Sequence, residues 1–512
     1  MQLGAGYVTD VDYVHGYYRV LQPDLMNLAC IWAGVRPPEV EAPNYLELGF
    51  GRGLSLNIHA AAAPGAYWGT DFNAGHGVEA SVLAAASGAG IRLFDESFAE
   101  LAERRDLPDF DYIVMHGVWS WLSPEDRDIV VDLLRRRLRP GGLFYVGYNC
   151  HSDWMASAPL QHLLGLHAEL TGSQSADLKT SVESGLEFVR KIMNAKARFF
   201  DQNPAVSSLL EALRTQSPNL VAHAYFSRHH SPEGFADVSR ILSAGNLSFA
   251  ASVKLLDRFD DINIPPEGQR LLQEIGQPSL AETLRDYFMN QRVRGDVFVK
   301  GMHRLTPEER LEALLSLRVM LIAHLEDVPR SVRGAVRDLD LNESVHRNLL
   351  ELLAADGHEP KPVRALVDAP GLRSLPRGPV VDALVALMGA GAVSTVRMPT
   401  ESTRARCRAL NRHFWNRSRT DGNIAWLASP VIGAGVSASR LEQLFTAAAA
   451  TGRAQPEQQA AVAWHFLSAQ GHRLTVAGRT LESPNENLTH LTEMAKVFNR
   501  KRLGILKTLE VL

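Results

Sequence analysis

The sequence predicts an α/β fold with a Rossmann-like, mainly parallel sheet, and three observations support this. Five short apolar runs, at residues 45–48, 66–72, 91–94, 111–115 and 143–149, have the length and composition of strands. A Gly-rich turn and an Ala-rich helical stretch follow the first run. Polar residues stand at the carboxyl end of each run, which is the edge where parallel α/β sheets bind ligands.

The first strand runs into Glu47-x-Gly49-x-Gly51-x-Gly53, and residues 54–63 are expected to form the next helix. Glycines at alternate positions allow a sharp turn with positive φ, and they bring backbone N–H groups close to a ligand. A dinucleotide site would instead have the spacing G-x-G-x-x-G. The observed spacing, with an acid two residues ahead, is typical of S-adenosylmethionine (SAM) sites, because the sulfonium and ammonium groups favour a nearby carboxylate. An ordinary tight βα turn is the alternative for this motif alone.

The other strand ends strengthen the SAM prediction. Asp71 ends the second strand, where a carboxylate can accept hydrogen bonds from both ribose hydroxyls. The third strand ends at residues 95–97, where the adenine amino group would be recognised. Aromatic and polar residues follow the fourth strand at 116–121, and the fifth strand ends at Tyr148 and Asn149. Together these ends predict one SAM site at the carboxyl edge of the sheet.

Composition excludes several classes of protein. A chain of 512 residues is expected to hold two to four domains. A net charge of −4 does not suggest a general nucleic-acid binder, and no nucleic-acid partner is expected. Cys30, Cys150 and Cys407 are too far apart for a metal or disulfide framework, so no metal is expected. Without a signal-like start or a long apolar run, a cytoplasmic protein without membrane spans is predicted.

The first domain is expected to cover residues 1–305. Its aromatic-rich start, residues 7–19, is read either as a helix beside the sheet or as a lid that turns Tyr13 and Tyr17 or Tyr18 toward the methyl donor. A helix is expected from Asp24 to the stop at Pro37.

A helical insertion is predicted at about residues 155–220, after the fifth strand. A helix is expected to begin at 231–233, with Pro232 in its first turn, and to run to Gly245. Strand six is expected at 247–253, and an antiparallel last strand at 294–301.

Residues 306–400 are predicted to form a winged-helix-like domain, with helices at 343–355, 362–367 and 380–388 and a wing strand at 389–396. Helix 380–388 carries no Lys or Arg, so it lacks the cations that reading a DNA groove requires, and packing or protein contact is expected instead.

Residues 401–512 form the predicted C-terminal domain, with a turn or strand at 429–436 and an amphipathic helix at 488–512. A cluster of arginines is interpreted as a solvated helix face, with an acidic partner as the alternative: Arg404, Arg406, Arg408, Arg412, Arg417 and Arg419.

These motifs resemble bacterial class I SAM-dependent methyltransferases that carry a methyltransferase regulatory domain, a group that includes rickettsial protein-lysine methyltransferases. The matching stretches are residues 7–10 with 16–18, 46–53, 67–73, 115–125, 140–142 and 145–149. The resemblance implies a seven-stranded sheet and SAM as the cofactor, with S-adenosylhomocysteine (SAH) as the product. The chain departs from the group's pattern at 152–154 and at 223–226, both on the expected substrate side.

Two sets of candidate site residues follow. The expected cofactor contacts are Glu47, Gly49, Phe50, Gly51, Gly53, Asp71, Phe72, Asn73, Asp95, Glu96, Ser97, His116, Gly117 and Tyr13. For catalysis, Tyr148 and Asn149 are expected to orient the substrate, and Trp119 or Trp154 to form a channel wall. His116 is a candidate general base, and Tyr17 is a candidate lid residue.

The chemistry of methyl transfer explains this choice of residues. In-line transfer depends mostly on positioning. A lysine amine, with a pKa of about 10.4, must first lose its proton, which burial in an aromatic channel favours. Aromatic faces also attract the methylammonium product.

Three functions remain open from the sequence. The first is methylation of protein side chains, most simply lysine. The second is a small-molecule N- or O-methyltransferase, and the third is a non-catalytic SAM-binding regulator with the winged-helix-like region as its output. A protein substrate or a small-molecule acceptor is therefore the expected partner, with a homodimer as one option for assembly.

Overall fold

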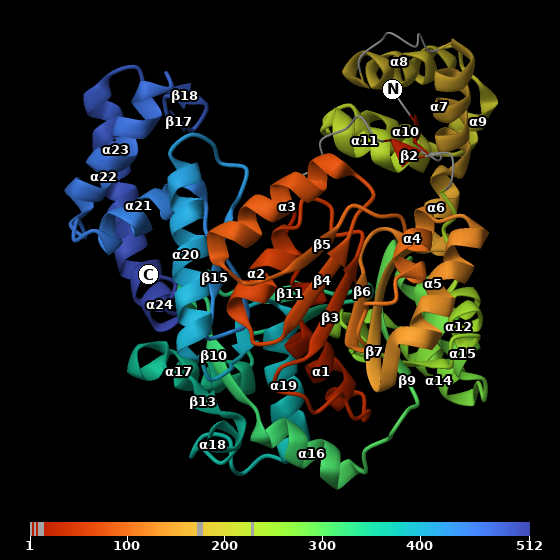
Figure 1. Ribbon diagram of the computed structural model, residues 1–512, viewed down its shortest axis with the longest axis horizontal. Helices are drawn as coiled ribbons and strands as arrows, with labels where there is room; N and C mark the ends of the chain where they lie inside the picture. Colours follow the sequence, from red (N-terminus) through yellow and green to blue (C-terminus); the bar gives the residue numbers. More distant parts are fainter. Residues whose placement is uncertain (1–2, 5–6, 9–14, 172–177, 227–229) are drawn as a thin grey trace.

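A seven-stranded mixed sheet forms the centre of the computed structural model, which describes residues 3–4, 7–8, 15–171, 178–226 and 230–512 (Figure 1). Its strand order is β5-β4-β3-β6-β7-β9-β8. The strands are β3 (Asn44–Leu48), β4 (Ala66–Thr70), β5 (Arg92–Phe94), β6 (Phe110–Met115), β7 (Leu138–Asn149), β8 (Leu247–Ser252) and β9 (Val293–Lys300). The first five are parallel, whereas β9 pairs antiparallel with both β7 and β8. The predicted α/β fold and the antiparallel last strand are therefore confirmed.

Helices cover both faces of the sheet, as the alternation of side chains along its strands requires. On one face, Leu46 and Leu48 of β3 share a core with helices α4 (Phe98–Glu103), α5 (Pro124–Arg137) and α12 (Phe235–Ser243). Tyr45 points to the opposite face, whose core includes residues of three further helices. These are α1 (Pro23–Trp32), α2 (Leu54–Ala62) and α3 (Ala74–Ser87).

The predicted helical insertion follows the short helix α6 (His151–Trp154) and projects from one end of the sheet (Figure 1). Its helices are α7 (Ala158–Thr171), α8 (Leu178–Asn194), α9 (Arg198–Gln202), α10 (Pro204–Leu213) and α11 (Pro218–Tyr225). They enclose a small core of their own, in which Leu164, Val189 and Leu210 are fully buried. The insertion thus extends slightly beyond the predicted end at 220.

The helix expected at 231–233 begins later than predicted, at Phe235. Glu233 is held in an extended bridge, where its N–H donates to the carbonyl of Asn149 at 2.9 Å. Its buried carboxylate accepts hydrogen bonds from Arg127 and from Trp119. These tertiary contacts override the Ser-Pro-Glu helix-start signal. The segment between β8 and β9 then adds α13 (Asp260–Asn263), α14 (Pro266–Glu274) and α15 (Pro278–Met289).

Residues 306–400 contain the predicted helices and a closing strand. The helices are α16 (Pro307–Ser316), α17 (Ser344–His358), α18 (Val363–Val367) and α19 (Arg377–Gly389). Strands β10 (Arg318–Leu321), β13 (Lys361–Pro362) and β14 (Val393–Thr395) form one small sheet, and β11 (Ser331–Arg333) pairs with β12 (Asp338–Asp340). The winged-helix assignment itself stays a prediction, as do the domain boundaries at 305 and 400.

Helix α19, the would-be recognition helix, packs inside the molecule. Its residues Val385 and Leu387 belong to the same core as Ala250 of β8. Its Asp382 accepts a hydrogen bond from the indole of Trp32 at 2.8 Å. A helix buried in this way has no free face for a DNA groove.

The C-terminal part packs against α2 and α3 through the long helix α20 (Glu401–Ser418) (Figure 1). The hairpin β15 (Trp426–Ser429) and β16 (Ala434–Ser437) follows, and then α21 (Arg440–Ala450), α22 (Pro456–Ala469), β17 (Thr475–Val476), β18 (Arg479–Thr480), α23 (Pro484–Phe498) and α24 (Gly504–Thr508). Several of the clustered arginines have partners within the chain: Arg404 pairs with Glu510, and Arg417 pairs with Glu79. Within the described ranges, every helix is too short or too polar to cross a membrane.

Candidate functional site

The site lies at the carboxyl ends of the parallel strands, where the strand order reverses between β3 and β6. The Gly-rich turn after β3 has positive φ at Gly49, Gly51 and Gly53. A Cβ on Gly49 would lie 2.7 Å from a methyl group of Val118, in the loop after β6. Glycine is therefore needed here for conformation and for the close approach of two loops that border the crevice.

Asp71 organises this turn from the end of β4. Its carboxylate accepts hydrogen bonds from the N–H of Gly51 at 2.8 Å and from the N–H of Asn73 at 3.0 Å, and it lies 3.1 Å from a ring nitrogen of His76. Asn73 in turn caps α3. The carboxylate is thus fixed beside the cofactor turn, as expected for a ribose ligand. The neighbouring Phe72 is exposed, and Phe50 is buried.

Glu47 is a buried carboxyl group within the same crevice. It is 3% exposed, and the Tyr45 hydroxyl lies 3.4 Å from its Oε2. Burial raises the pKa of Glu47 to about 8, and the nearby Asp71 carboxylate adds to this rise. Glu47 is therefore largely protonated at neutral pH, and a cation beside it would favour the ionised form. The two carboxyl groups, Glu47 and Asp71, therefore fit a ligand that carries positive charge.

Most of the candidate residues after β5, at positions 95–97, already have partners within the chain. Glu96 pairs with Arg104 at 2.6 Å, and Ser97 caps α4 in a capping box with Glu100. Asp95 is exposed at the same edge. Two of the three predicted adenine-side residues thus have structural partners, and Asp95 is the one we still expect to contact a ligand.

His116, directly after β6, faces the fifth strand. Its Nδ1 lies 2.8 Å from the Tyr145 hydroxyl, and its ring packs on Tyr18 with centroids 4.3 Å apart. Burial lowers the pKa of His116 to about 4, aided by the charge of Lys254. The ring is therefore neutral, but so low a pKa makes it a weak base toward a lysine ammonium. The contacts favour a positioning role over the predicted general-base role. Gly117, next to it, has positive φ.

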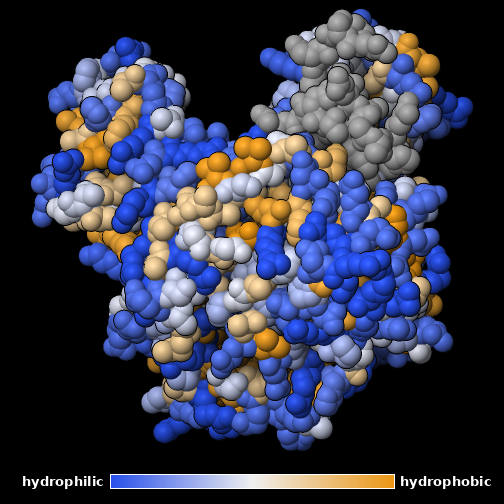
Figure 2. All heavy atoms as spheres, viewed as in Figure 1, coloured by the Kyte–Doolittle hydropathy of each residue, from blue (hydrophilic) through white to orange (hydrophobic). Residues whose placement is uncertain are grey.

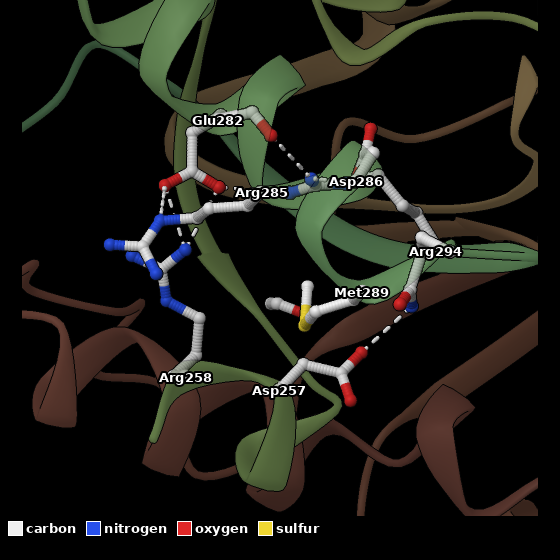
Figure 3. A pocket seen from close by; sticks show the side chains of 9 residues that line it. Asp257, Arg258, Glu282, Arg285, Asp286, Met289 and Arg294 are labelled. Carbon is white, nitrogen blue, oxygen red and sulfur yellow. Dashed lines mark hydrogen bonds and ion pairs between the residues drawn. The ribbon is translucent and has the colours of Figure 1, made fainter. Parts of the chain in front are cut away.

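Three candidate catalytic residues lie in the core instead of the crevice. The Tyr148 hydroxyl donates to Asp296 at 2.8 Å, within the buried charge cluster of which Figure 3 shows Arg294, Glu282 and Asp286. Trp119 is fully buried and donates to Glu233. The Tyr17 hydroxyl accepts from the N–H of Gly435 at 2.7 Å, far along the chain.

These placements give Tyr148, Trp119 and Tyr17 partners in the core and do not support their predicted catalytic roles. Strand alternation turns Tyr148 to the face opposite Tyr145. Tyr145, which was not predicted, is therefore the tyrosine that contacts His116. Tyr18, not Tyr17, faces the site. Tyr13 lies outside the described residues.

Asn149 and Trp154 do come together, around a residue that was not predicted. The Asn149 amide nitrogen donates to His230 Nε2 at 2.9 Å, and the other ring nitrogen of His230 lies 2.9 Å from Gln161 Oε1. Trp121 stacks on the His230 ring at 4.2 Å, and Trp154 contacts its edge at 4.7 Å. We refer to these five residues as the His230 cluster. It sits between the end of β7 and the helical insertion.

We expect that replacing Asp71 by alanine weakens SAM binding about 10- to 100-fold, as the loss of charge-assisted hydrogen bonds implies. Isothermal titration with SAM and with SAH measures this. Glu96→Ala is the matched control, because its carboxylate already pairs with Arg104. Equal affinities for the two variants would exclude Asp71 from the ribose site.

Comparison with known proteins gives concordant matches. The family described as "Methyltransferase domain" matches residues 46–144, and the family described as "Predicted methyltransferase regulatory domain" matches residues 217–300. The sll1526 protein of Synechocystis sp. (strain ATCC 27184 / PCC 6803 / Kazusa) is 33% identical over 100% of both chains. The RP789 protein of Rickettsia prowazekii (strain Madrid E) is 24% identical over 57% of this chain and 53% of its own length.

Among solved structures, PKMT2 from Rickettsia typhi in complex with AdoHcy shares the fold. The TM-score is 0.69, with 16% identity, and the match covers 98% of this chain and 99% of that one. The likeness therefore includes the helical insertion and the C-terminal part as well as the central sheet.

Proposed function

Because the chain belongs to the SAM-dependent methyltransferases that carry a methyltransferase regulatory domain, we propose that it methylates lysine side chains of a protein substrate. The observation that carries the lysine assignment is the His230 cluster, an aromatic site at the carboxyl end of β7, where the Arg292 guanidinium over the Trp154 ring adds a positive charge that disfavours a second cation. Such surroundings favour a neutral amine over an ammonium ion, and they also accommodate a methylated product. The sequence resemblance to rickettsial protein-lysine methyltransferases points the same way.

The residues of the crevice fit SAM, which supplies a methyl group on a positively charged sulfur. Glu47 would place a negative charge near that cation, the turn at Gly49 and Gly51 would present backbone N–H groups, and Asp71 would accept the ribose hydroxyls. Asp95 is the proposed contact on the adenine side. These assignments rest on the chemistry of the groups and their place at the strand ends.

On the acceptor side, the cluster would orient the amine. The side-chain amide nitrogen of Asn149 is engaged by His230, and within the described part of the chain the side-chain oxygen Oδ1 accepts no hydrogen bond. That oxygen can accept one N–H of the incoming amine and direct the nitrogen lone pair toward the methyl group. The lone pair forms the new N–C bond as the S–C bond breaks, after the amine has lost its proton to solvent. Positioning of this kind accounts for much of the rate.

The shape of the molecule suits a large substrate. Figure 2 shows a broad notch between the helical insertion and the C-terminal helices. Phe72, Val78 and Val82 are exposed at the end of β4 and on α3. An open surface of this kind is easier to reconcile with a protein than with a metabolite, which is usually enclosed. We also propose a cytoplasmic location and, as one option for assembly, a homodimer.

The direct test is transfer of labelled methyl groups from SAM into a cell lysate, with the Asp71→Ala protein, at a SAM concentration too low to saturate it, as the control. Label in discrete protein bands, stable to acid and to base, is the expected result. Label confined to small molecules would replace the proposal with a metabolite methyltransferase. No label, despite SAM binding, would favour a SAM-binding regulator.

Replacing Asn149 by alanine should slow methyl transfer about tenfold, the value of one orienting hydrogen bond, with SAM affinity unchanged. Single-turnover rates and titrations measure the two quantities. Tyr148→Phe is the matched control. It changes the residue directly before Asn149 on β7, but the hydroxyl that it removes lies on the opposite face of the sheet. A transfer rate for Asn149→Ala equal to that of the control would remove Asn149 from the site.

A further inference from the structure

A second ionic cluster lies behind the cofactor turn and joins four distant segments of the chain. Its centre is Glu79 on α3. One carboxylate oxygen of Glu79 accepts from Arg52 at 2.6 Å, and the other accepts from Arg417 of α20 at 2.8 Å. His15 contacts Glu79 as well, and its Nε2 lies 3.1 Å from Arg417 Nη2. We call these four residues the Glu79 cluster.

Each member sits where it can affect the cofactor turn. Arg52 lies within the turn, between Gly51 and Gly53, so its side chain helps to fix the backbone that presents N–H groups to SAM. Glu79 belongs to the helix that begins directly after Asp71 and Asn73. Arg417 comes from the C-terminal part, more than three hundred residues away in sequence.

The cluster is shielded enough to hold a defined geometry. The side chains of Glu79, Arg52 and His15 are 18%, 15% and 7% exposed. Hydrogen bonds from His15 and Arg417 outweigh the desolvation of Glu79 and lower its pKa, so the carboxylate stays ionised. Asp421 lies 3.4 Å from Arg417 and offsets part of the positive charge.

A neighbouring contact braces the second helix of the site. Arg406 of α20 donates to the carbonyl of Ala63, at the end of α2. Helix α20 thus holds both α2 and α3, whose N-termini border the cofactor crevice. Nothing in the methyl-transfer chemistry itself requires a helix of the C-terminal part at this place.

We propose that the C-terminal part sets the affinity for SAM through the Glu79 cluster, with Arg417 as a positioning residue that orders the cofactor turn through Glu79 and Arg52. A change that moves α20 would loosen the turn and release the cofactor, and SAM binding would in turn hold α20 in place. This inference depends on SAM binding and not on the identity of the methyl acceptor.

The test compares Arg417→Gln with Arg404→Gln by titration with SAH. Arg404 is on the same helix but pairs with Glu510, inside the C-terminal part. We expect Arg417→Gln to weaken SAH binding about fivefold and to raise the KM for SAM equally, with kcat at saturating SAM unchanged. Arg417→Lys should restore most of the affinity, whereas Arg404→Gln should bind SAH like the unmodified protein. Equal affinities for the two glutamine variants would overturn the proposal.

A double-mutant cycle separates positioning from a general loss of packing. Arg52→Gln and Arg417→Gln should be strongly non-additive in SAH affinity, because both act through the same carboxylate. Additive effects would mean that Arg417 acts by another route and would also overturn the proposal. Should Arg417→Gln fail to fold, Glu79→Gln keeps the size of the side chain while removing the charge, and it should weaken SAH binding to a similar degree.

Discussion

Replacing Arg294 by methionine is expected to lower the free energy of unfolding by about 3–5 kcal/mol, because it leaves buried carboxylates without their counter-ion. Arg294 lies on β9 and is 6% exposed. Its guanidinium group bonds to Asp296 at 2.6 Å, to Asp286 at 2.8 Å and to Glu282 at 3.1 Å. Methionine fills much of the same volume but supplies neither charge nor donors.

The neighbouring groups cannot easily compensate for this loss. Arg258 and Arg285 also pair with Glu282 (Figure 3). Asp286 instead depends on Arg294, and Asp296 depends on Arg294 and on the Tyr148 hydroxyl. One oxygen of Asp286 is already buried without a partner among the described residues. Burial raises the pKa of Asp286 to about 6 even with Arg294 present. In the variant, both carboxyl groups would have to take up protons or admit water.

Urea unfolding measures the effect, with Arg270→Met as the control. Arg270 forms an exposed pair with Glu267 on α14, so its loss should cost less than about 0.5 kcal/mol. The deficit of Arg294→Met should shrink as the pH falls, since protonation removes the unpaired charges. A deficit no larger than that of the control would show that the cluster is not a stabilising element.

Local sequence was sufficient to place the candidate cofactor residues at the sheet edge, while their contacts with SAM stay a prediction. Glu47, Gly49, Gly51 and Asp71 were predicted because a strand, a turn and a helix within one short segment place them at the sheet edge. The two-residue alternation of side chains along a strand shows which of its residues face the same side of the sheet. Along β7 the same alternation places Tyr145 and Tyr148 on opposite faces of the sheet, and Tyr145 is the one that contacts His116.

Contacts between distant segments could not be predicted. His230 reaches Asn149 across 81 positions, and Glu233 reaches Trp119 across 114. No local pattern marks either partner, and the aromatic residues after β6 look alike in sequence although Trp119 is core and Trp121 lines the His230 cluster. Burial and partner choice are set by the tertiary fold, which one sequence does not reveal.

The affinity for SAM should rise with pH, about tenfold per unit from pH 6 to about 8, and then level off. The cause is Glu47, whose pKa of about 8 keeps it protonated below that value. Only the ionised form attracts a cationic ligand, so binding below pH 8 must release the proton. Titrations in two buffers of different ionisation enthalpy report both the affinity and the proton released.

Glu47→Gln is the decisive comparison, because it keeps the size of the side chain and cannot ionise. Its affinity should be low and should lose this pH dependence, while any titration of SAM itself would appear in both proteins. A flat affinity profile for the unmodified protein between pH 6 and 8 would exclude Glu47 as the group that responds to the cation.

The unliganded protein should show the opposite trend in stability. A carboxyl group whose pKa is raised on folding, from 4.5 to about 8, contributes stability that is complete below pH 4.5 and is lost as the pH rises through 8. Saturating SAM should cancel this dependence, because Glu47 is ionised both in the unfolded chain and in the complex, so the tighter binding at higher pH offsets the stability that is lost. One buried carboxyl group would thus link cofactor binding to folding, and melting curves with and without SAM at pH 6 and pH 8 would show whether SAM removes the difference in stability between the two pH values.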